Sequence, residues 1–471
     1  MPTPDEIRER LRLYYAHDAV RARIVEFLGG TFLEQGTCEY VLGSPTAAFS
    51  TATPRPRSAV LESFEQGEDI ARALWDHKRL LAHLDVEYVN GEFVAEPYLD
   101  PRRTFQLQIP VVRAIEKILL GVGISPLHQL TGRGHHFVWS VAQDSDTFRR
   151  LAALGPVSEG MLQMYAQPHP PHGHAIRAEL ARAFAGLGLL MEYLAHLIQR
   201  EAGAETQVPI QLTDVEVGSG ERGRESIVID ISEYADPLHT RVIRVPFSVY
   251  LKPQGMAGAL SEEMIRAVPL MFQIPMFEIS ETEAIEVMRS ADLTAELASR
   301  AAVRIPDQSG PVGVLLERYQ SSPLAAFHGR FYSQEQHPPE RWPETYDRLD
   351  LHELPNCVRD ILENPNDRLL KPAGIQLVVR VLMALGWHPR HVAGLIRSKY
   401  ERDFHWGTRW LRYNAACRAD AYTRLFAGQI ATGADSLIDF NCVSNREKGY
   451  CGHHNCEHNL ADYRDLLLSR I

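Results

Sequence analysis

Every run of residues that predicts a β-strand lies in the first 252 residues of this 471-residue chain. The runs are short, rich in β-branched and aromatic residues, and separated by stretches of helical periodicity. They read LLAHLDVEYVN, SPLHQL, HHFVWSVA, ESIVIDIS and TRVIRVPFSVYL. Beyond residue 265 the periodic segments are helical. This order predicts an α+β body followed by a mostly helical module.

The length of the chain exceeds what one hydrophobic core usually holds, so we expect more than one domain. Helical patterns are predicted at 5–28, 68–83, 108–123, 175–203, 281–303, 371–386, 388–401, 408–427 and 459–470. A turn-rich region at about 318–350 is expected to separate the domains. The predicted division is an N-terminal helical segment (1–60), a core (61–265), a helical connector (266–345) and a C-terminal domain (346–471).

The net charge of −11 argues against a broadly basic nucleic-acid binder. The charge is uneven, however, because residues 351–471 carry 16 Lys+Arg and 13 Asp+Glu, and the remainder carries 33 and 47. Contact with nucleic acid is therefore expected in local grooves. No uninterrupted run of about 18 apolar residues is present, and the N-terminus lacks the order of a secretory signal, so we expect a cytoplasmic protein without a membrane span.

Three acidic residues are candidates for binding a divalent cation. Asp85 and Glu87 are separated by one residue, so on a strand both side chains leave the same face. Two such carboxylates suit Mg²⁺ or Mn²⁺, which prefer oxygen ligands. Asp230 ends the strand-like run ESIVID and is a candidate for the same site. A solvated strand face for the pair and a turn cap for Asp230 are the alternatives.

Cations follow in the segment TRVIRVPFSVYLK. Arg244, Ser248 and Lys252 share parity, whereas Arg241 falls on the other face of a regular strand, and Pro246 is a candidate interruption. Cations beside a carboxylate cluster suit a nucleoside triphosphate. An amphipathic edge strand is the alternative.

The segment LTGRGHHFVW places two glycines before two adjacent histidines. Gly132 and Gly134 are expected to let the backbone approach a ligand, as phosphate-binding loops do. On a strand, His135 and His136 point to opposite faces, so one of them is expected to enter the site. A pair of structural histidines and a zinc site are the alternatives, and adjacent strand residues are poor ligands for one tetrahedral ion.

The order LDVEYV, TGRGHHFVW, VID and RVIRVPFSVYLK resembles the catalytic core of archaeo-eukaryotic primases and primase-polymerases. The resemblance implies a core of mixed β-sheets flanked by helices, and implies that Asp85, Glu87 and Asp230 bind two catalytic Mg²⁺ or Mn²⁺ ions. It further implies that His136 contacts the phosphates of the incoming nucleotide. The full set of nucleotide-binding residues implied is Thr131, Gly132, Arg133, Gly134, His136, Arg244, Ser248 and Lys252.

Some positions depart from the family pattern. Glu87 stands where aspartate is commoner, Thr131 replaces a serine, and Tyr250 occupies a position where relatives often have histidine. No cysteine-rich zinc knuckle occurs between residues 60 and 350. The stretch QPHPPHGH, with His169, His172 and His174, is a candidate substitute, although a Pro/His loop without metal is the preferred interpretation.

Five of the six cysteines lie in the last quarter of the chain, which in a cytosolic protein favours metal over disulfides. Four thiolates can hold zinc or a 4Fe–4S cluster. The segment LPNC, the cysteine spacing and HNLADY resemble the iron–sulfur domain of primase large subunits, which favours a cluster over Zn²⁺. The ligands implied are Cys357, Cys442, Cys451 and Cys456. If the metal were zinc, His453, His454 or His458 could replace a cysteine, whereas Cys417 is expected to be a buried thiol.

The resemblance implies a DNA-dependent primase/polymerase, a nucleotidyltransferase that makes short RNA or DNA primers on single-stranded DNA by two-metal transfer. Its implied partners are the DNA template and NTPs or dNTPs, with a helicase or another replication or defence protein as further candidates. A polymerase that only extends primers in repair is one alternative. A nucleic-acid-binding replication scaffold with a decayed active site is another, and the presence of all three acidic residues counts against it.

Overall fold

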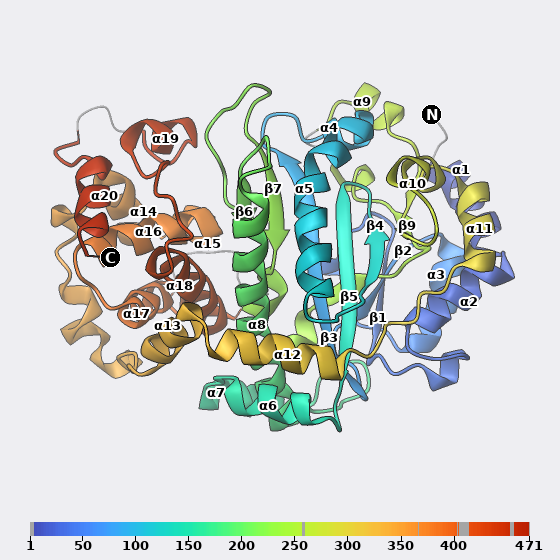
Figure 1. Ribbon diagram of the computed structural model, residues 1–471, viewed down its shortest axis with the longest axis horizontal. Helices are drawn as coiled ribbons and strands as arrows, with labels where there is room; N and C mark the ends of the chain where they lie inside the picture. The colour runs from blue at the N-terminus through green and yellow to red at the C-terminus, as the bar shows by residue number, and fades with distance from the viewer. Residues whose placement is uncertain are drawn as a thin grey trace. The chain divides into compact units, whose positions relative to one another are not determined.

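The computed structural model describes residues 4–256, 260–365, 367–402, 404, 414–452 and 456–470. Helices and mixed β-sheets are both present, which confirms the predicted α+β class (Figure 1). The chain forms two compact units. Unit 1 comprises residues 1–189, 205–207 and 238–314, and unit 2 comprises residues 190–204, 208–237 and 315–471. The division into two compact units does not test the four predicted domains, which therefore stay predictions.

The helices and strands have the following bounds. The helices are α1 (Pro4–Tyr15), α2 (Asp18–Phe27), α3 (Val60–Gln66), α4 (Glu96–Leu99), α5 (Pro101–Leu120), α6 (Asp146–Leu154), α7 (Glu159–Tyr165), α8 (Ala178–Ala202), α9 (Glu262–Ala267), α10 (Glu281–Val287), α11 (Ala291–Arg300), α12 (Ser309–Gln320), α13 (Pro323–Tyr332), α14 (Asn356–Glu363), α15 (Asp367–Leu370), α16 (Pro372–Ala384), α17 (Pro389–Tyr400), α18 (Ala415–Ala431), α19 (Cys442–Glu447) and α20 (Leu460–Leu468). The strands are β1 (Val41–Ser44), β2 (Asp69–Ala73), β3 (Arg79–Asn90), β4 (Leu127–Leu130), β5 (Gly134–Ala142), β6 (Ile210–Leu212), β7 (Glu225–Asp230), β8 (Val242–Arg244), β9 (Val249–Tyr250), β10 (Met271–Phe272) and β11 (Ile274–Pro275).

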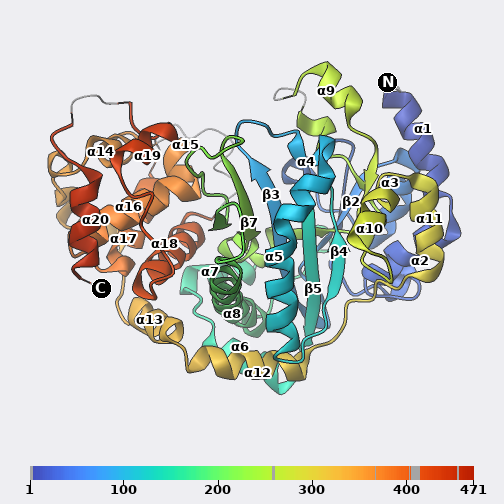
Figure 2. The ribbon, with the colours of Figure 1, turned by 45° about the horizontal axis from the view of Figure 1, so that its top comes forward.

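Unit 1 is built on antiparallel sheets. Strands β11, β4, β5 and β3 pair in that order, and the longest ladder joins β3 to β5. Strand β2 pairs with β1 on one side and β8 on the other, and β9 pairs with β10. Helix α5 lies along the β3–β5 ladder in both views (Figures 1 and 2). One face of the ladder is therefore covered by α5.

Helix α5 has clear sequence signals at both ends. The Asp100 side chain accepts a hydrogen bond from the Arg103 amide at 3.4 Å, Pro101 occupies the first turn, and Gly121 follows the last turn. Its apolar face includes Phe105 and Val111, both fully buried. Burial of this face fixes the helix on the sheet.

Unit 2 contains a short parallel pair, β6 and β7, and the helices of the C-terminal region. Helix α16 packs against α17, α18 and α20, and its apolar residues are almost all buried. The predicted helices at 371–386, 388–401 and 459–470 are confirmed by α16, α17 and α20. The prediction at 408–427 is confirmed only for α18, since residues 405–413 lie outside the described part of the chain.

One prediction of secondary structure is wrong, and two are completed in detail by the structure. The helix expected at 68–83 is replaced by β2 and the start of β3, because the helix there ends at Gly67, which has a left-handed φ of 64°. The helical segment expected at 281–303 is confirmed and consists of two helices, α10 and α11, each started by a serine cap. The turn-rich region 318–350 contains a complete helix, α13, capped by Ser322.

Helix α8 is long and apolar enough to cross a membrane by length and composition. However, 78% of its most apolar window is buried within the protein, as in the core helix of a soluble protein. The helix is therefore weak evidence for a membrane span. The cytoplasmic location stays a prediction.

Candidate active site

The β3–β5 ladder brings the first acidic residue of the predicted site to a histidine. Asp85 and His136 are direct cross-strand partners, and Nε2 of His136 lies 3.4 Å from Oδ1 of Asp85. Glu87 leaves the same face two residues further along β3, beside Gly134 of β5. His83 lies two residues in the other direction, and its ring meets that of His136 edge-on at 4.5 Å. Two carboxylates and two imidazoles therefore share one face of the ladder.

Two cations hold Glu87. The Arg133 guanidinium donates to Oε2 of Glu87, and Nζ of Lys252 lies 3.4 Å from its Oε1. Burial alone would raise the pKa of the Glu87 carboxyl, but the charges of Arg133 and Lys252 outweigh it and hold that pKa well below its usual range. Burial and the Arg133 charge lower the pKa of the Lys252 amine, although Glu87 opposes them. Glu87 is thus an anion at neutral pH, paired with more than one positive charge.

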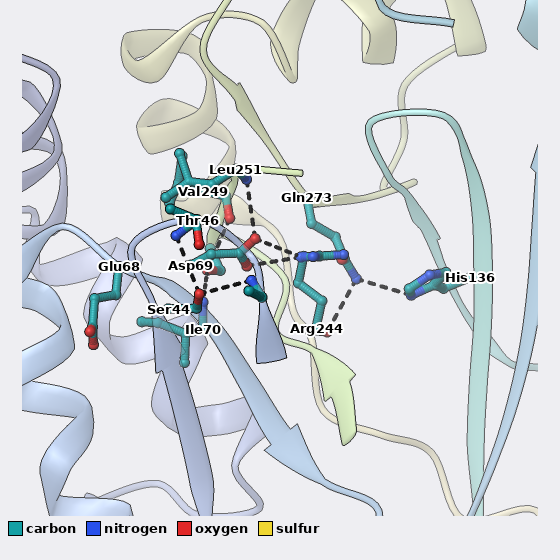
Figure 3. A network of polar contacts seen from close by, with 12 residues as sticks. Ser44, Thr46, Glu68, Asp69, Ile70, His136, Arg244, Val249, Leu251 and Gln273 are labelled. Carbon is teal, nitrogen blue, oxygen red and sulfur yellow. Dashed lines mark hydrogen bonds and ion pairs between the residues drawn. The ribbon is translucent and has the colours of Figure 1, made fainter. Parts of the chain in front are cut away.

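Arg244 belongs to a second, adjoining ion pair. Its Nε donates to both carboxylate oxygens of Asp69, at 2.8 and 3.1 Å, and its guanidinium lies 4.5 Å from the ring centre of Tyr250. Burial would lower the pKa of Arg244, but the Asp69 carboxylate outweighs it and raises that pKa. Gln273 joins this pair to the ladder, since its Nε2 donates to the Arg244 carbonyl at 3.3 Å and lies 3.5 Å from Nδ1 of His136 (Figure 3).

The two glycines of the β4–β5 turn are needed for packing within the protein. A Cβ atom at Gly132 would lie 2.4 Å from the Tyr250 ring, and one at Gly134 would lie 1.9 Å from the Val86 carbonyl oxygen. The Thr131 amide donates to the Gly134 carbonyl at 2.8 Å, which closes the turn. The lack of a side chain at both positions therefore lets the protein pack closely against itself, and the approach of a ligand to this turn stays a prediction. The buried Thr131 hydroxyl has no hydrogen-bond partner among the residues that the structure describes.

The two adjacent histidines face opposite sides, which confirms the prediction from strand parity. His135 is buried against the Phe105 ring of α5, and its Nδ1 lies 3.0 Å from Nε2 of His128. Burial and the neighbouring imidazoles, His128 first, lower the pKa of His135 well below its usual value. His135 is thus a neutral structural residue, and His136 is the histidine on the Asp85 face.

Ser248 does not share this polar face. Its buried hydroxyl accepts a hydrogen bond from the Ile70 amide at 2.7 Å and lies 3.3 Å from the Tyr15 hydroxyl. The predicted interruption before it is confirmed, because Phe247 has a φ of 65° and separates β8 from β9. The Ser248 hydroxyl therefore fixes β2 and α1 to this bend.

Asp230 belongs to unit 2, at the end of β7. Its carboxylate accepts hydrogen bonds from the Ser232 amide at 2.9 Å and from the Ser232 hydroxyl at 3.1 Å, as a turn cap does. Its convergence on the other two acidic residues stays a prediction.

The four cysteines of the predicted cluster all lie in unit 2. Burial raises the pKa of the Cys357 thiol to about 12, and Cys451, Cys442 and Cys456 raise it too, so these three thiols lie within electrostatic reach of Cys357. Within the described residues, one group of three or more His, Cys, Asp or Glu ligand atoms lies within 4.8 Å of one another, and it contains none of these cysteines. His453 and His454 lie outside the described residues.

Sequence reasoning missed several residues of the site. Asp69 lies in GEDIARALW, a segment predicted as a helix, and Gln273 lies in a segment to which no role was given. A charged residue within an otherwise apolar run is the sequence signal that could have identified Asp69. No local signal identifies Gln273, because its partners lie far away in the sequence.

No protein-family model, no curated protein and no solved structure matches this chain. Its function is therefore inferred from its own residues and their geometry.

Proposed function

We propose that this protein is a DNA-dependent primase/polymerase that makes short RNA or DNA primers on single-stranded DNA from NTPs or dNTPs. One observation carries the proposal: Asp85 and Glu87 share a strand face with His136, and Glu87 pairs with Arg133 and Lys252. Paired carboxylates and several cations at one place suit a metal-bound triphosphate. The assignment of the mixed sheets to a primase-polymerase fold is part of the same proposal.

The residues fit a Mg²⁺ or Mn²⁺ site at this face. The Asp85 and Glu87 side chains are 16% and 13% exposed, and Oδ1 of Asp85 is buried. Carboxylate oxygens are the ligands that these ions prefer. Such ions activate the attacking hydroxyl and neutralise the leaving pyrophosphate. With ions held by these carboxylates, Arg133 and Lys252 would be placed to pair with phosphate oxygens. His136, beside Asp85, is then placed to donate a hydrogen bond to a phosphate oxygen. Asp230 is the third carboxylate of the proposed site.

The proposal includes a 4Fe–4S cluster, or alternatively Zn²⁺, held by the four cysteines named above. The influence of the other three cysteines on the pKa of Cys357 supports it. Without metal the Cys357 thiol stays protonated, and a bound metal would hold the four sulfurs as thiolates.

The direct test is primer synthesis on circular single-stranded DNA with labelled NTPs or dNTPs and Mg²⁺ or Mn²⁺. We expect product from the unchanged protein and from Asp146→Asn, since Asp146 is an exposed aspartate on α6. Asp85→Asn should reduce synthesis at least 100-fold without loss of folding, because it removes one charged ligand and keeps the side-chain shape. Retained synthesis by Asp85→Asn would refute the metal assignment.

Two further measurements separate the alternatives. A protein that extends a supplied primer but makes none on bare template is the repair polymerase of the first alternative. A protein that binds single-stranded DNA and shows neither activity, in Mg²⁺ or in Mn²⁺, is the scaffold of the second, and that result would end the enzymatic proposal.

The cluster is tested by anaerobic purification followed by visible absorption and metal analysis. Cys442→Ser should abolish a brown iron–sulfur signal, whereas Cys417→Ser should retain it, because Cys417 lies on α18 and is not one of the four implied ligands. Colourless protein with stoichiometric zinc would replace iron by Zn²⁺. Metal content that is unchanged in Cys442→Ser would contradict both.

A further inference from the structure

Unit 1 contains a second cluster of ligand-type side chains, outside the candidate active site. Glu39 follows α2, His77 lies between β2 and β3, and His174 lies in the Pro/His loop before α8. Nε2 of His77 lies 2.5 Å from Oε2 of Glu39, and Nδ1 of His174 lies 2.9 Å from Oε1 and 3.1 Å from Oε2. One ligand atom from each residue therefore lies within 4.8 Å of the other two.

The backbone holds the first two of these residues in place. The Glu39 amide donates to the Trp75 carbonyl at 3.0 Å, and the His77 amide donates to the Thr37 carbonyl at 2.9 Å. A bridge between Cys38 and Asp76 lies between these two hydrogen bonds. The chain segments that carry Glu39 and His77 thus run antiparallel as a short ladder.

The loop that carries His174 is anchored as well. The His169 amide donates to the His174 carbonyl at 2.8 Å, and the Gly173 amide donates to the His169 carbonyl at 2.9 Å, which closes the loop on itself. The His169 ring stacks on His239 with ring centres 4.0 Å apart and meets Trp75 edge-on. His174 is therefore presented by a tight turn fixed to the body of unit 1.

The buried carboxylate of Glu39 is contacted by two imidazoles. Its side chain is 0% exposed, and its ionic partners within the described chain are His77 and His174, which are 41% and 54% exposed. A bound cation would supply a counter-charge to this buried carboxylate. The buried guanidinium of Arg72 is already paired with a different carboxylate, since one of its nitrogens lies 2.7 Å from Oδ2 of Asp76.

We propose that Glu39, His77 and His174 bind a divalent transition-metal ion, with Zn²⁺ as the preferred ion. Two imidazole nitrogens and one carboxylate oxygen form a donor set suited to zinc and related first-row ions. The two imidazoles border a cavity of about 480 Å³ that also includes Gln143 and Arg177. This cavity leaves room beside the imidazoles for water or a small ligand as a further metal ligand. Zinc–ligand distances of about 2.0–2.1 Å separate tetrahedral ligand atoms by roughly 3.3 Å, so the exposed imidazoles would move back from Glu39 by less than about 1 Å.

The test measures zinc stoichiometry on the full chain after chelation and dialysis, with excess Mg²⁺ present to fill carboxylate-only sites. We expect His77→Ala and His174→Ala to bind one zinc equivalent less than the unchanged protein. His172→Ala is the matched control, since His172 is an exposed histidine of the same loop whose ring lies 5.5 Å from that of His174. Glu39→Gln should lose the same equivalent.

Co²⁺ substitution distinguishes this site from the cysteines. Thiolate ligands give Co²⁺ strong sulfur charge-transfer absorption in the near ultraviolet, whereas nitrogen and oxygen ligands give visible bands alone. We expect His174→Ala to lose a visible component and to keep any sulfur band, and Cys442→Ser to do the reverse. Zinc stoichiometry and Co²⁺ spectra identical in the unchanged protein and His174→Ala would overturn the proposal and leave a histidine–carboxylate hydrogen bond only. Because His174 is more than half exposed, its replacement is not expected to unfold the protein.

Discussion

Asp85 of β3 and His136 of β5 face each other across the ladder, with Nε2 of His136 3.4 Å from Oδ1 of Asp85. The preceding residue, His135, points to the other face and packs on α5. One strand thus carries a structural histidine and a candidate catalytic histidine next to each other. This relationship makes the two roles separable by experiment.

Replacement of each histidine by glutamine should have opposite effects. His136→Gln should reduce nucleotide incorporation at least tenfold, while the free energy of unfolding falls by less than it does in His135→Gln, because a glutamine amide can still donate to Oδ1 of Asp85. His135→Gln should lower the free energy of unfolding by about 1–3 kcal/mol, because it disturbs a buried contact with His128. Primer synthesis and urea unfolding measure the two effects. Equal stability losses and equal activities for both variants would contradict the division of roles.

Gly132 is expected to be intolerant of any side chain, because its Cβ position lies 2.4 Å from the Tyr250 ring. Gly132→Ala should reduce the free energy of unfolding by about 1–3 kcal/mol through overpacking. The same substitution should cost less in a Tyr250→Leu background, where the ring is absent, and a double-mutant cycle by urea unfolding measures the difference. Gly160→Ala is the control, since no heavy atom lies within 4 Å of its Cβ position. Equal costs in both backgrounds would show that Tyr250 is not the obstacle.

The buried imidazole of His128 is expected to make the folded protein less stable in mild acid. Burial lowers its pKa to about 4, whereas the unfolded chain has a histidine pKa of about 6.5. Between these values the unfolded state binds more protons than the folded state, so the free energy of unfolding falls as the pH falls from about 6.5 to about 4. The contribution of this one residue is at most about 3 kcal/mol over that range.

Urea unfolding at several pH values between 4 and 7 checks this expectation. His128→Gln should flatten the pH dependence, whereas His172→Gln should not, because His172 is exposed. A slope unchanged by His128→Gln would show that the imidazole is protonated in the folded protein as easily as in the unfolded chain.

Local patterns predicted the parts of the fold that depend on local physics. Strand parity placed His135 and His136 on opposite faces, and Pro246 marked the bend between β8 and β9. The segment that became β2 was misread because it holds Asp69 and Arg72, charges that do not suit a buried strand. Both charges are compensated by partners supplied by the fold, Arg244 for Asp69 and Asp76 for Arg72.

The candidate sites show the same difference between features that neighbouring residues determine and features that residues far apart in the sequence determine. The acidic pair on β3 was predicted from its spacing alone, since the side chains of residues two positions apart on a strand point to the same face. Glu39, His77 and His174 carry no shared sequence pattern, because three distant segments bring them together. The resemblance of short motifs to a family also does not show where Asp230 lies relative to the other acidic residues, because that position depends on the tertiary structure.

A buried charge network in unit 2 gives the last prediction. Glu192 is 1% exposed, and its carboxylate accepts a hydrogen bond from Nε of Arg424 at 2.8 Å and lies 3.0 Å from Nε2 of His328. The Tyr319 hydroxyl lies 2.8 Å from Nδ1 of His328, and Arg424 donates to the Tyr332 hydroxyl at 2.8 Å. Burial would raise the pKa of Glu192, but Arg424 and His328 outweigh it and lower that pKa to about 2. Each charge in this network is therefore satisfied only while its partners are present.

Removal of one partner should cost more than removal of both charges. Glu192→Gln leaves Arg424 buried without a counter-charge and should lower the free energy of unfolding by about 3–5 kcal/mol, whereas Glu192→Leu combined with Arg424→Leu should cost clearly less than the sum of the single changes. Glu401→Gln is the control, because its Arg397 pair is partly exposed and is expected to contribute less than about 1 kcal/mol. Urea unfolding followed by a tryptophan signal measures the first transition, since two compact units need not unfold together. A Glu192→Gln protein as stable as the Glu401→Gln protein would mean that water reaches Arg424 and that the network is not sealed from solvent.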